Sequence, residues 1–125
     1  MLALWLTATG SRADEILLDI GSMAPKPHLG FGWAQSEMID GRQFRWIKHL
    51  EADLRIEIGS ARDAVLAMRV RPQYLSYTRQ TVSILLNGSY VGEWVCADHA
   101  GYETYQLAIP ARFWKSGENV LTFRM

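Results

Sequence analysis

Aromatic side chains offer the clearest chemistry in this sequence, because five Trp and five Tyr occur among 125 residues. A flat aromatic ring packs against the apolar C–H face of a sugar, while nearby polar groups bond the hydroxyls. We predict a sugar-binding site from the aromatic and polar residues that fall in loops. Trp33 ends a loop rich in Pro and Gly, and Tyr77 lies in a loop that begins at Pro72. His99 and Tyr102 lie together between two predicted strands.

The aromatic residues within predicted strands have a different expected role. Trp46 and Trp94 are predicted to lie in the core, and Trp114 to fill space beneath the last turn. Arg45 stands between Phe44 and Trp46. One expectation is that it faces outward while Phe44 and Trp46 face inward; the other is that it stacks on an aromatic ring or pairs with a carboxylate. A structural ion pair is favoured over a ligand contact. Glu37 and Glu51 are its candidate partners.

The sequence shows no motif for a catalytic metal site and no evident catalytic centre. His28, His49 and His99 are isolated, and the chain has neither an HxH nor an HExxH motif. No GxSxG, P-loop or dinucleotide-binding motif is present. Paired carboxylates for glycoside hydrolysis would need a distinguishing motif that is absent. We therefore expect no enzyme activity and no cofactor, although a structural calcium ion is an alternative, with candidate ligands Asp19, Asp40 and Asp98.

Composition indicates one globular domain spanning residues 1–125. Thirteen basic residues balance thirteen acidic ones, so nothing electrostatic favours nucleic acid as a partner. No apolar run is long enough to insert in a membrane. Residues 1–14 read either as a remnant of a signal segment or as a first strand. Cys96 is expected to be a small buried side chain, with a reactive thiol near His99 as the alternative.

Apolar residues recur with a period of two, which predicts an antiparallel β-sandwich of about eight or nine strands. The clearest strand is residues 52–58, where Ala52, Leu54, Ile56 and Ile58 alternate with charged residues. Residues 64–70 suit a central strand, and residues 23–32 a loop. The strongest local feature is Asn87-Gly88 between two strands, which predicts a hairpin with a type I′ turn. Residues 112–117 are predicted to form a short turn or one helical turn.

Several segments together resemble a known family. They are an early LLDIG, then LGFGW, FRW, LxMRVRP, VxxLLNG, TYxLxIP and a final GENVLTF. Residues 15–125 are similar to the galactose-binding-like jelly-roll domains appended to bacterial extracytoplasmic proteins, including glycosidases, sulfatases and membrane glycosyltransferases. The resemblance implies a jelly roll in a periplasmic or secreted protein. It also implies a non-catalytic module that binds carbohydrate or packs beside a catalytic domain.

Three functions follow from these observations. The leading hypothesis is a non-catalytic carbohydrate-binding or accessory module, with ligand contacts from Trp33, Tyr77, His99 and Tyr102. The second is a structural module for protein–protein interaction or oligomerisation, through exposed edge strands or an apolar patch. The third, an enzyme acting on glycans, is the least favoured because no nucleophile–base pair or metal set is evident.

Overall fold

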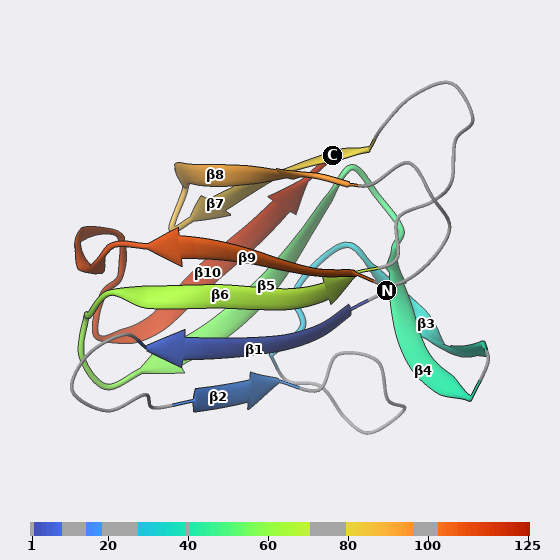
Figure 1. Cartoon of the computed structure of the whole chain (residues 1–125), viewed down its shortest axis with the longest axis horizontal. Helices are drawn as coiled ribbons and strands as arrows, with labels where there is room; N and C mark the ends of the chain where they lie inside the picture. Colours follow the sequence, from blue (N-terminus) through green and yellow to red (C-terminus); the bar gives the residue numbers. More distant parts are fainter. Residues whose placement is uncertain (1, 9–14, 19–27, 40, 71–79, 97–102) are drawn as a thin grey trace.

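The chain is all-β in the computed structural model, which describes residues 2–8, 15–18, 28–39, 41–70, 80–96 and 103–125 (Figure 1). Within these ranges lie ten strands and a single 3₁₀ turn, η1 (Ala111–Phe113). The strands are β1 (Leu2–Ala8), β2 (Glu15–Leu18), β3 (Trp33–Ile39), β4 (Arg42–Ile47), β5 (Glu51–Ile58), β6 (Ala64–Val70), β7 (Thr81–Leu86), β8 (Ser89–Val95), β9 (Glu103–Ile109) and β10 (Gly117–Arg124). The predicted all-β class is confirmed, with β3 as a strand that the sequence pattern did not indicate.

Two four-stranded antiparallel sheets pack face to face around one core. Sheet I has the order β2-β1-β6-β9 and sheet II the order β5-β10-β7-β8. Figure 1 shows the strands of sheet I lying across those of sheet II. Both sheets supply the buried side chains, among them Leu66 and Met68 from sheet I and Leu54, Ile84 and Phe123 from sheet II. Because each sheet buries one face against the other, the architecture is that of a β-sandwich.

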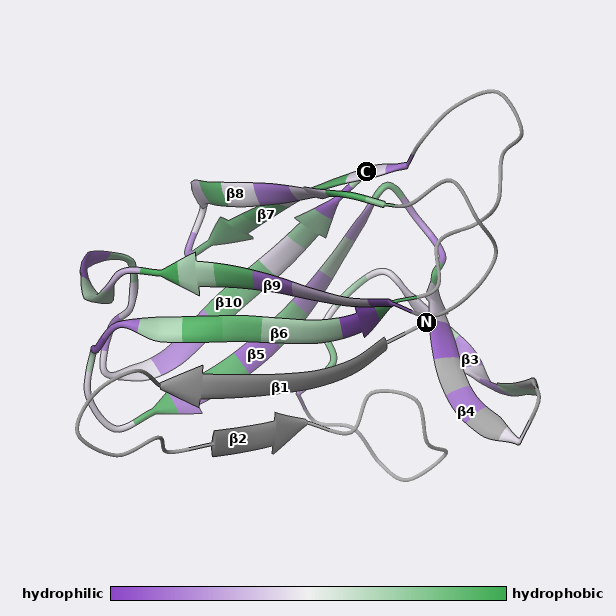
Figure 2. Ribbon diagram, viewed as in Figure 1, coloured by the Kyte–Doolittle hydropathy of each residue, from purple (hydrophilic) through white to green (hydrophobic). Residues whose placement is uncertain are grey.

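Strand β5 confirms the alternation that predicted it. Ala52, Leu54 and Ile56 are at most 1% exposed, whereas Arg55 and Glu57 are exposed. The same alternation appears along β5 as changing hydropathy in Figure 2. Strand β6 lies between β1 and β9, as a largely apolar sequence requires for a central strand.

The β7–β8 hairpin turns at Asn87-Gly88 as predicted. Asn87 has a φ of 51° and Gly88 a φ of 84°, the positive values that a type I′ turn needs. Farther along β8, Gly92 lies so close to β9 that a Cβ atom would be 2.6 Å from Cδ1 of Leu107. The indole Nε1 of Trp94 donates to the backbone oxygen of Gln106 at 3.1 Å. These contacts join the neighbouring edges of the two sheets.

Residues 28–31 extend sheet II beyond β5, although the sequence predicted only a loop there. Leu29 bridges to Leu54, and the backbone nitrogen of Gly30 donates to the Asp53 oxygen at 2.9 Å. Gly32 then redirects the chain with a φ of 97°. A Cβ atom on Gly32 would lie 2.0 Å from the backbone oxygen of Glu51, so only glycine fits this turn. The chain continues into the separate two-stranded β3–β4 sheet.

Asn119 is a fully buried polar residue at the start of β10. Its Nδ2 donates to the backbone oxygens of Lys115 at 2.8 Å and Gly117 at 3.1 Å. Its Oδ1 accepts from the backbone nitrogen of Lys115 at 3.0 Å and from Nδ2 of Asn87 at 2.9 Å. A buried amide is tolerated only when its polar atoms are bonded, and here both are. Asn119 thereby ties the η1 region to the β7–β8 hairpin.

Candidate functional site

The structure describes one of the four residues predicted to bind a ligand. Trp33, at the start of β3, is half-buried. Its Nε1 donates to the backbone oxygen of Asp53 at 2.8 Å, and its ring meets Phe123 edge-on with centroids 6.3 Å apart. Trp33 therefore packs against the margin of the core and bonds β5. Tyr77, His99 and Tyr102 lie outside the described residues.

Described residues that flank the other three candidates converge at one end of the sandwich. The backbone nitrogen of Cys96 donates to the Gln80 oxygen at 2.8 Å. Nε2 of Gln80 lies 3.0 Å from Sδ of Met125, and the Met125 nitrogen donates to the Leu50 oxygen at 2.9 Å. The side chain of Cys96 is hydrogen-bonded with Tyr105. We call this the Met125 end, defined by Leu50, Gln80, Cys96 and Met125.

An exposed pair of stacked rings lies beside this end. Phe31 and His49 stack with centroids 4.8 Å apart and an interplanar angle of 13°. Phe31 is 63% exposed, His49 is exposed, and the adjacent Leu50 is 74% exposed. We call Phe31 and His49 the Phe31–His49 platform. Such exposure of planar and apolar groups suits contact with a ligand or partner rather than a role in the core.

Backbone hydrogen bonds hold the two segments of the platform together. The Lys48 nitrogen donates to the Gly32 oxygen at 2.7 Å, and the Asp53 nitrogen donates to the Phe31 oxygen at 2.9 Å. The backbone beside each ring is therefore hydrogen-bonded, that of Gly30 and Phe31 to β5, that of Lys48 to Gly32, and that of Leu50 to Met125. The rings are displayed by a fixed backbone, which lowers the entropy lost when a ligand binds.

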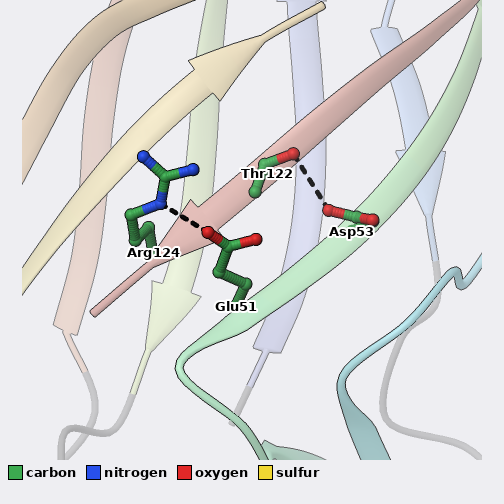
Figure 3. A network of polar contacts seen from close by, with 4 residues as sticks. All are labelled: Glu51, Asp53, Thr122 and Arg124. Atoms are coloured by element: carbon green, nitrogen blue, oxygen red, sulfur yellow. Dashed lines mark hydrogen bonds and ion pairs between the residues drawn. The ribbon is translucent and has the colours of Figure 1, made fainter. Parts of the chain in front are cut away.

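Polar side chains of β5 and β10 lie on the outward face of sheet II (Figure 3). Glu51, two residues after His49, pairs through Oε1 with Nε of Arg124 at 2.6 Å. Oγ1 of Thr122 donates to Oδ1 of Asp53 at 2.9 Å. Figure 3 shows both contacts bridging β5 and β10. Carboxylate, guanidinium and hydroxyl groups of this kind can bond sugar hydroxyls on either the donor or the acceptor side.

The outward face of sheet II is acidic. The alternation of its strands places on this face five carboxylates and two guanidiniums, from Glu51, Asp53, Glu57, Glu93 and Glu118 and from Arg55 and Arg124. The resulting formal charge of −3 contrasts with the net charge of 0 for the whole chain. Glu57 and Glu118 are direct cross-strand partners, an arrangement of like charges that repels further anions.

Sequence reasoning missed Phe31 and the pairing of His49 with it. The segment Gly30-Phe31-Gly32 contains a signal that the ring of Phe31 is exposed. The two neighbouring glycines have no side chains that could cover a large aromatic ring. In the sequence His49 is an isolated histidine without a metal-binding motif, and in the structure it is exposed between β4 and β5. The stacking itself depends on the approach of two distant segments, which spacing in the sequence does not reveal.

The predictions for the other aromatic residues have mixed outcomes. Trp94 is 5% exposed and belongs to the core, as expected. Trp114, which was predicted to fill space beneath the last turn, is also 5% exposed and belongs to the core. The core prediction for Trp46 is wrong, because Trp46 is half-buried on β4 and donates through Nε1 to Oε2 of Glu37 at 2.8 Å. The reason is that β4 pairs with β3 in a separate sheet rather than entering either layer of the sandwich.

Arg45 is bonded within the β3–β4 sheet. Its Nη1 donates to the backbone oxygen of Ala34 at 3.1 Å. Of the two carboxylates predicted as its partners, Glu37 accepts from the indole of Trp46 and Glu51 pairs with the guanidinium of Arg124. Arg45 therefore helps to hold the two strands of the hairpin together.

Cys96 is buried, as expected, with an exposed fraction of 1%. Burial raises the pKa of its thiol above the ordinary value, and the side-chain hydrogen bond with Tyr105 acts in the opposite direction. A buried thiol with a raised pKa carries little thiolate at neutral pH and is a poor nucleophile.

Metal ligands do not cluster in the part of the chain that the structure describes. Among those residues, no group of three or more His, Cys, Asp or Glu side chains is placed to hold a metal ion. The candidate calcium ligands Asp19, Asp40 and Asp98 all lie outside them. A separate finding is that the described ranges contain no helix with the length and apolarity to span a membrane.

Comparison of the chain with models of protein families, with curated proteins and with solved structures gave no match.

Proposed function

We propose that the sandwich is a jelly roll. From β5 onward the chain passes repeatedly between the sheets, with β5, β7, β8 and β10 in sheet II and β6 and β9 in sheet I. The last strand, β10, lies between β5 and β7, and β1 lies between β2 and β6. Crossing between two packed antiparallel sheets in this way supports a double Greek-key arrangement. A crystal or NMR structure with another strand order would contradict the proposal.

We propose that the protein is a non-catalytic module that binds carbohydrate at the Met125 end. The observation that carries this proposal is the Phe31–His49 platform, a largely exposed stacked pair beside polar side chains. The apolar face of a sugar would pack on Phe31, and Glu51 and Arg124 would bond its hydroxyls. Tyr77, His99 and Tyr102 are included as contacts because Gln80 and Cys96 belong to this end and Tyr105, three residues after Tyr102, is hydrogen-bonded with Cys96.

The charge of the adjoining face indicates which glycans would bind. Uronic-acid and sulfated chains would meet the −3 outward face of sheet II and be repelled. An uncharged oligosaccharide avoids this cost while still using the carboxylates as hydrogen-bond acceptors. We therefore propose neutral glycans as the ligand class.

Calorimetry with a panel of neutral and anionic oligosaccharides tests the proposal. Phe31→Ala should weaken binding of a neutral glycan by at least about tenfold, which corresponds to about 1.4 kcal/mol. Met38→Ala is the matched control, because Met38 is also 63% exposed but lies on β3 away from the platform. Absence of binding across the panel, or equal effects of the two substitutions, would overturn the proposal.

A second candidate function is self-association through the same end. Three large apolar side chains are more than half exposed there, Phe31 at 63%, Leu50 at 74% and Val95 at 51%. A second copy of the chain would cover them and gain the free energy of burying apolar surface. The solution mass distinguishes the two functions: a stable dimer that Leu50→Asp dissociates, without affinity for sugars, favours self-association.

A further inference from the structure

The Asn87-Gly88 turn carries a reactive pair of groups that neither proposed function uses. The backbone nitrogen of a glycine that follows asparagine can attack the side-chain carbonyl of that asparagine, since no Cβ atom blocks its approach. Both residues are exposed at the tip of the β7–β8 hairpin. The chain holds one other asparagine, Asn119, and the Val120 that follows it has a branched side chain that hinders the same attack.

The side chain of Asn87 is bonded at both of its polar atoms. Oδ1 accepts from the backbone nitrogen of Val120 at 2.9 Å. Nδ2 donates to Oδ1 of Asn119 at 2.9 Å and to the backbone oxygen of Phe113 at 3.3 Å. For the Cγ atom to reach the nitrogen of Gly88, these contacts must first open. The folded protein therefore holds a labile asparagine in an unreactive position.

We propose that Asn87 is a deamidation site, restrained by its contact with Asn119, and that its modification breaks this junction. The backbone nitrogen of Gly88 forms a bond to Cγ of Asn87, and the side-chain nitrogen leaves as ammonia, which gives a cyclic succinimide. Water then adds to either carbonyl and opens the ring. The products are aspartate, or isoaspartate in which the backbone runs through the former side chain.

The product cannot restore the two contacts that Nδ2 of Asn87 donates, although its carboxylate can still accept from the Val120 nitrogen. A carboxylate at position 87 offers only acceptors to Oδ1 of Asn119 and to the Phe113 oxygen, and both of these are themselves acceptors. Asn119 is fully buried, so water does not readily replace the lost donor. Isoaspartate also adds a backbone atom to a turn that requires positive φ at position 87. Modification would thus loosen both the hairpin and the η1 region.

Peptide mass spectrometry of the full chain, incubated at neutral pH and sampled over time, tests the proposal. Asn87 should deamidate at least about tenfold more slowly in the native protein than in the same protein unfolded in urea, because reaction waits for local opening. Asn119, followed by Val120, should stay unmodified under both conditions and serves as the internal control. Equal native and unfolded rates at Asn87 would overturn the proposal.

Two variants test separately whether Asn119 restrains the deamidation of Asn87 and whether deamidation destabilises the protein. Asn119→Ala, if folded by circular dichroism, should deamidate at Asn87 faster than the wild type, and an unchanged rate would contradict the restraint. If this variant does not fold, the wild-type comparison decides the question alone. Asn87→Asp should lower the urea midpoint, whereas Ser89→Asp, at the exposed first residue of β8, should not. An unchanged midpoint in Asn87→Asp would show that modification leaves the junction intact.

Discussion

The side-chain nitrogen of Asn87 donates to the side-chain oxygen of Asn119 across 2.9 Å, which links an exposed turn to a fully buried amide. Asn119 makes three further hydrogen bonds to the backbone of Lys115 and Gly117. The arrangement adds side-chain hydrogen bonds between the β7–β8 hairpin and the start of β10 to the backbone pairing of β7 with β10.

The first prediction concerns Asn119. Asn119→Ala should lower the free energy of unfolding by about 3 kcal/mol, because it removes the four hydrogen bonds of a fully buried amide. Urea denaturation measures this change. Glu118→Ala, at an exposed neighbouring position, should change it by less than about 0.5 kcal/mol. A loss below about 1 kcal/mol in Asn119→Ala would show that the network contributes little.

The second prediction concerns the turn into β3. Gly32→Ala should destabilise the protein by more than about 2 kcal/mol, because the new Cβ atom would overlap the Glu51 oxygen at a φ of 97°. Gly41→Ala is the matched control, since Gly41 has a φ of 74° but no atom within 4 Å of the added Cβ. Its cost should be limited to about 1 kcal/mol of backbone strain. Thermal unfolding of both variants tests the difference, and similar losses would refute the steric explanation.

The third prediction separates folding from binding in two aromatic residues. Trp33→Phe should lower stability by about 1 kcal/mol, because it removes the 2.8 Å hydrogen bond to the Asp53 oxygen while keeping a ring against Phe123. Phe31→Ala should change stability by less than about 0.5 kcal/mol, since the ring is 63% exposed. Urea midpoints measure both. A large loss in Phe31→Ala would mean that the platform serves the fold.

The fourth prediction concerns pH. Burial raises the pKa of the Cys96 thiol in the folded state. The contribution of the protonated thiol to stability is therefore complete at pH values below the pKa that the thiol has in the unfolded chain. Stability should fall as the pH rises through the window between the unfolded and folded pKa values, by up to about 1.4 kcal/mol per pH unit. Cys96→Ala should lose this dependence. Urea titrations of both proteins at pH values above 8 measure this dependence, since an ordinary thiol has a pKa of about 8.5. If the stabilities of the two proteins change in parallel with pH, the prediction is wrong.

The parts of the fold that the sequence predicts are those that depend on neighbouring residues. The alternation in β5 and the Asn87-Gly88 turn are properties of adjacent residues, so their structures follow from short segments. Strand β3 escapes prediction because its sequence, WAQSEMI, lacks a clean alternation, and because the strand lies with β4 in a separate two-stranded sheet. Its conformation depends on a partner strand rather than on an apolar face.

The site is harder to predict because it depends on where distant segments meet. Trp46 has the aromatic character of a core residue, and only the assignment of β4 to a separate sheet shows that it is half-buried. Phe31 and His49 come together because residues 28–31 run beside β5, which no periodicity in the sequence indicates. Loop position alone suggested Trp33, yet its indole bonds β5 and its ring packs against Phe123.

The indole of Trp94 also bears on how the protein avoids aggregation. Strand β9 is an edge of sheet I, and an unpaired edge is a template for a strand from another molecule. Nε1 of Trp94 reaches from sheet II to the Gln106 oxygen on β9. A strand from another molecule that paired with β9 would have to displace the buried indole of Trp94. This core residue therefore also hinders intermolecular pairing at the edge of sheet I.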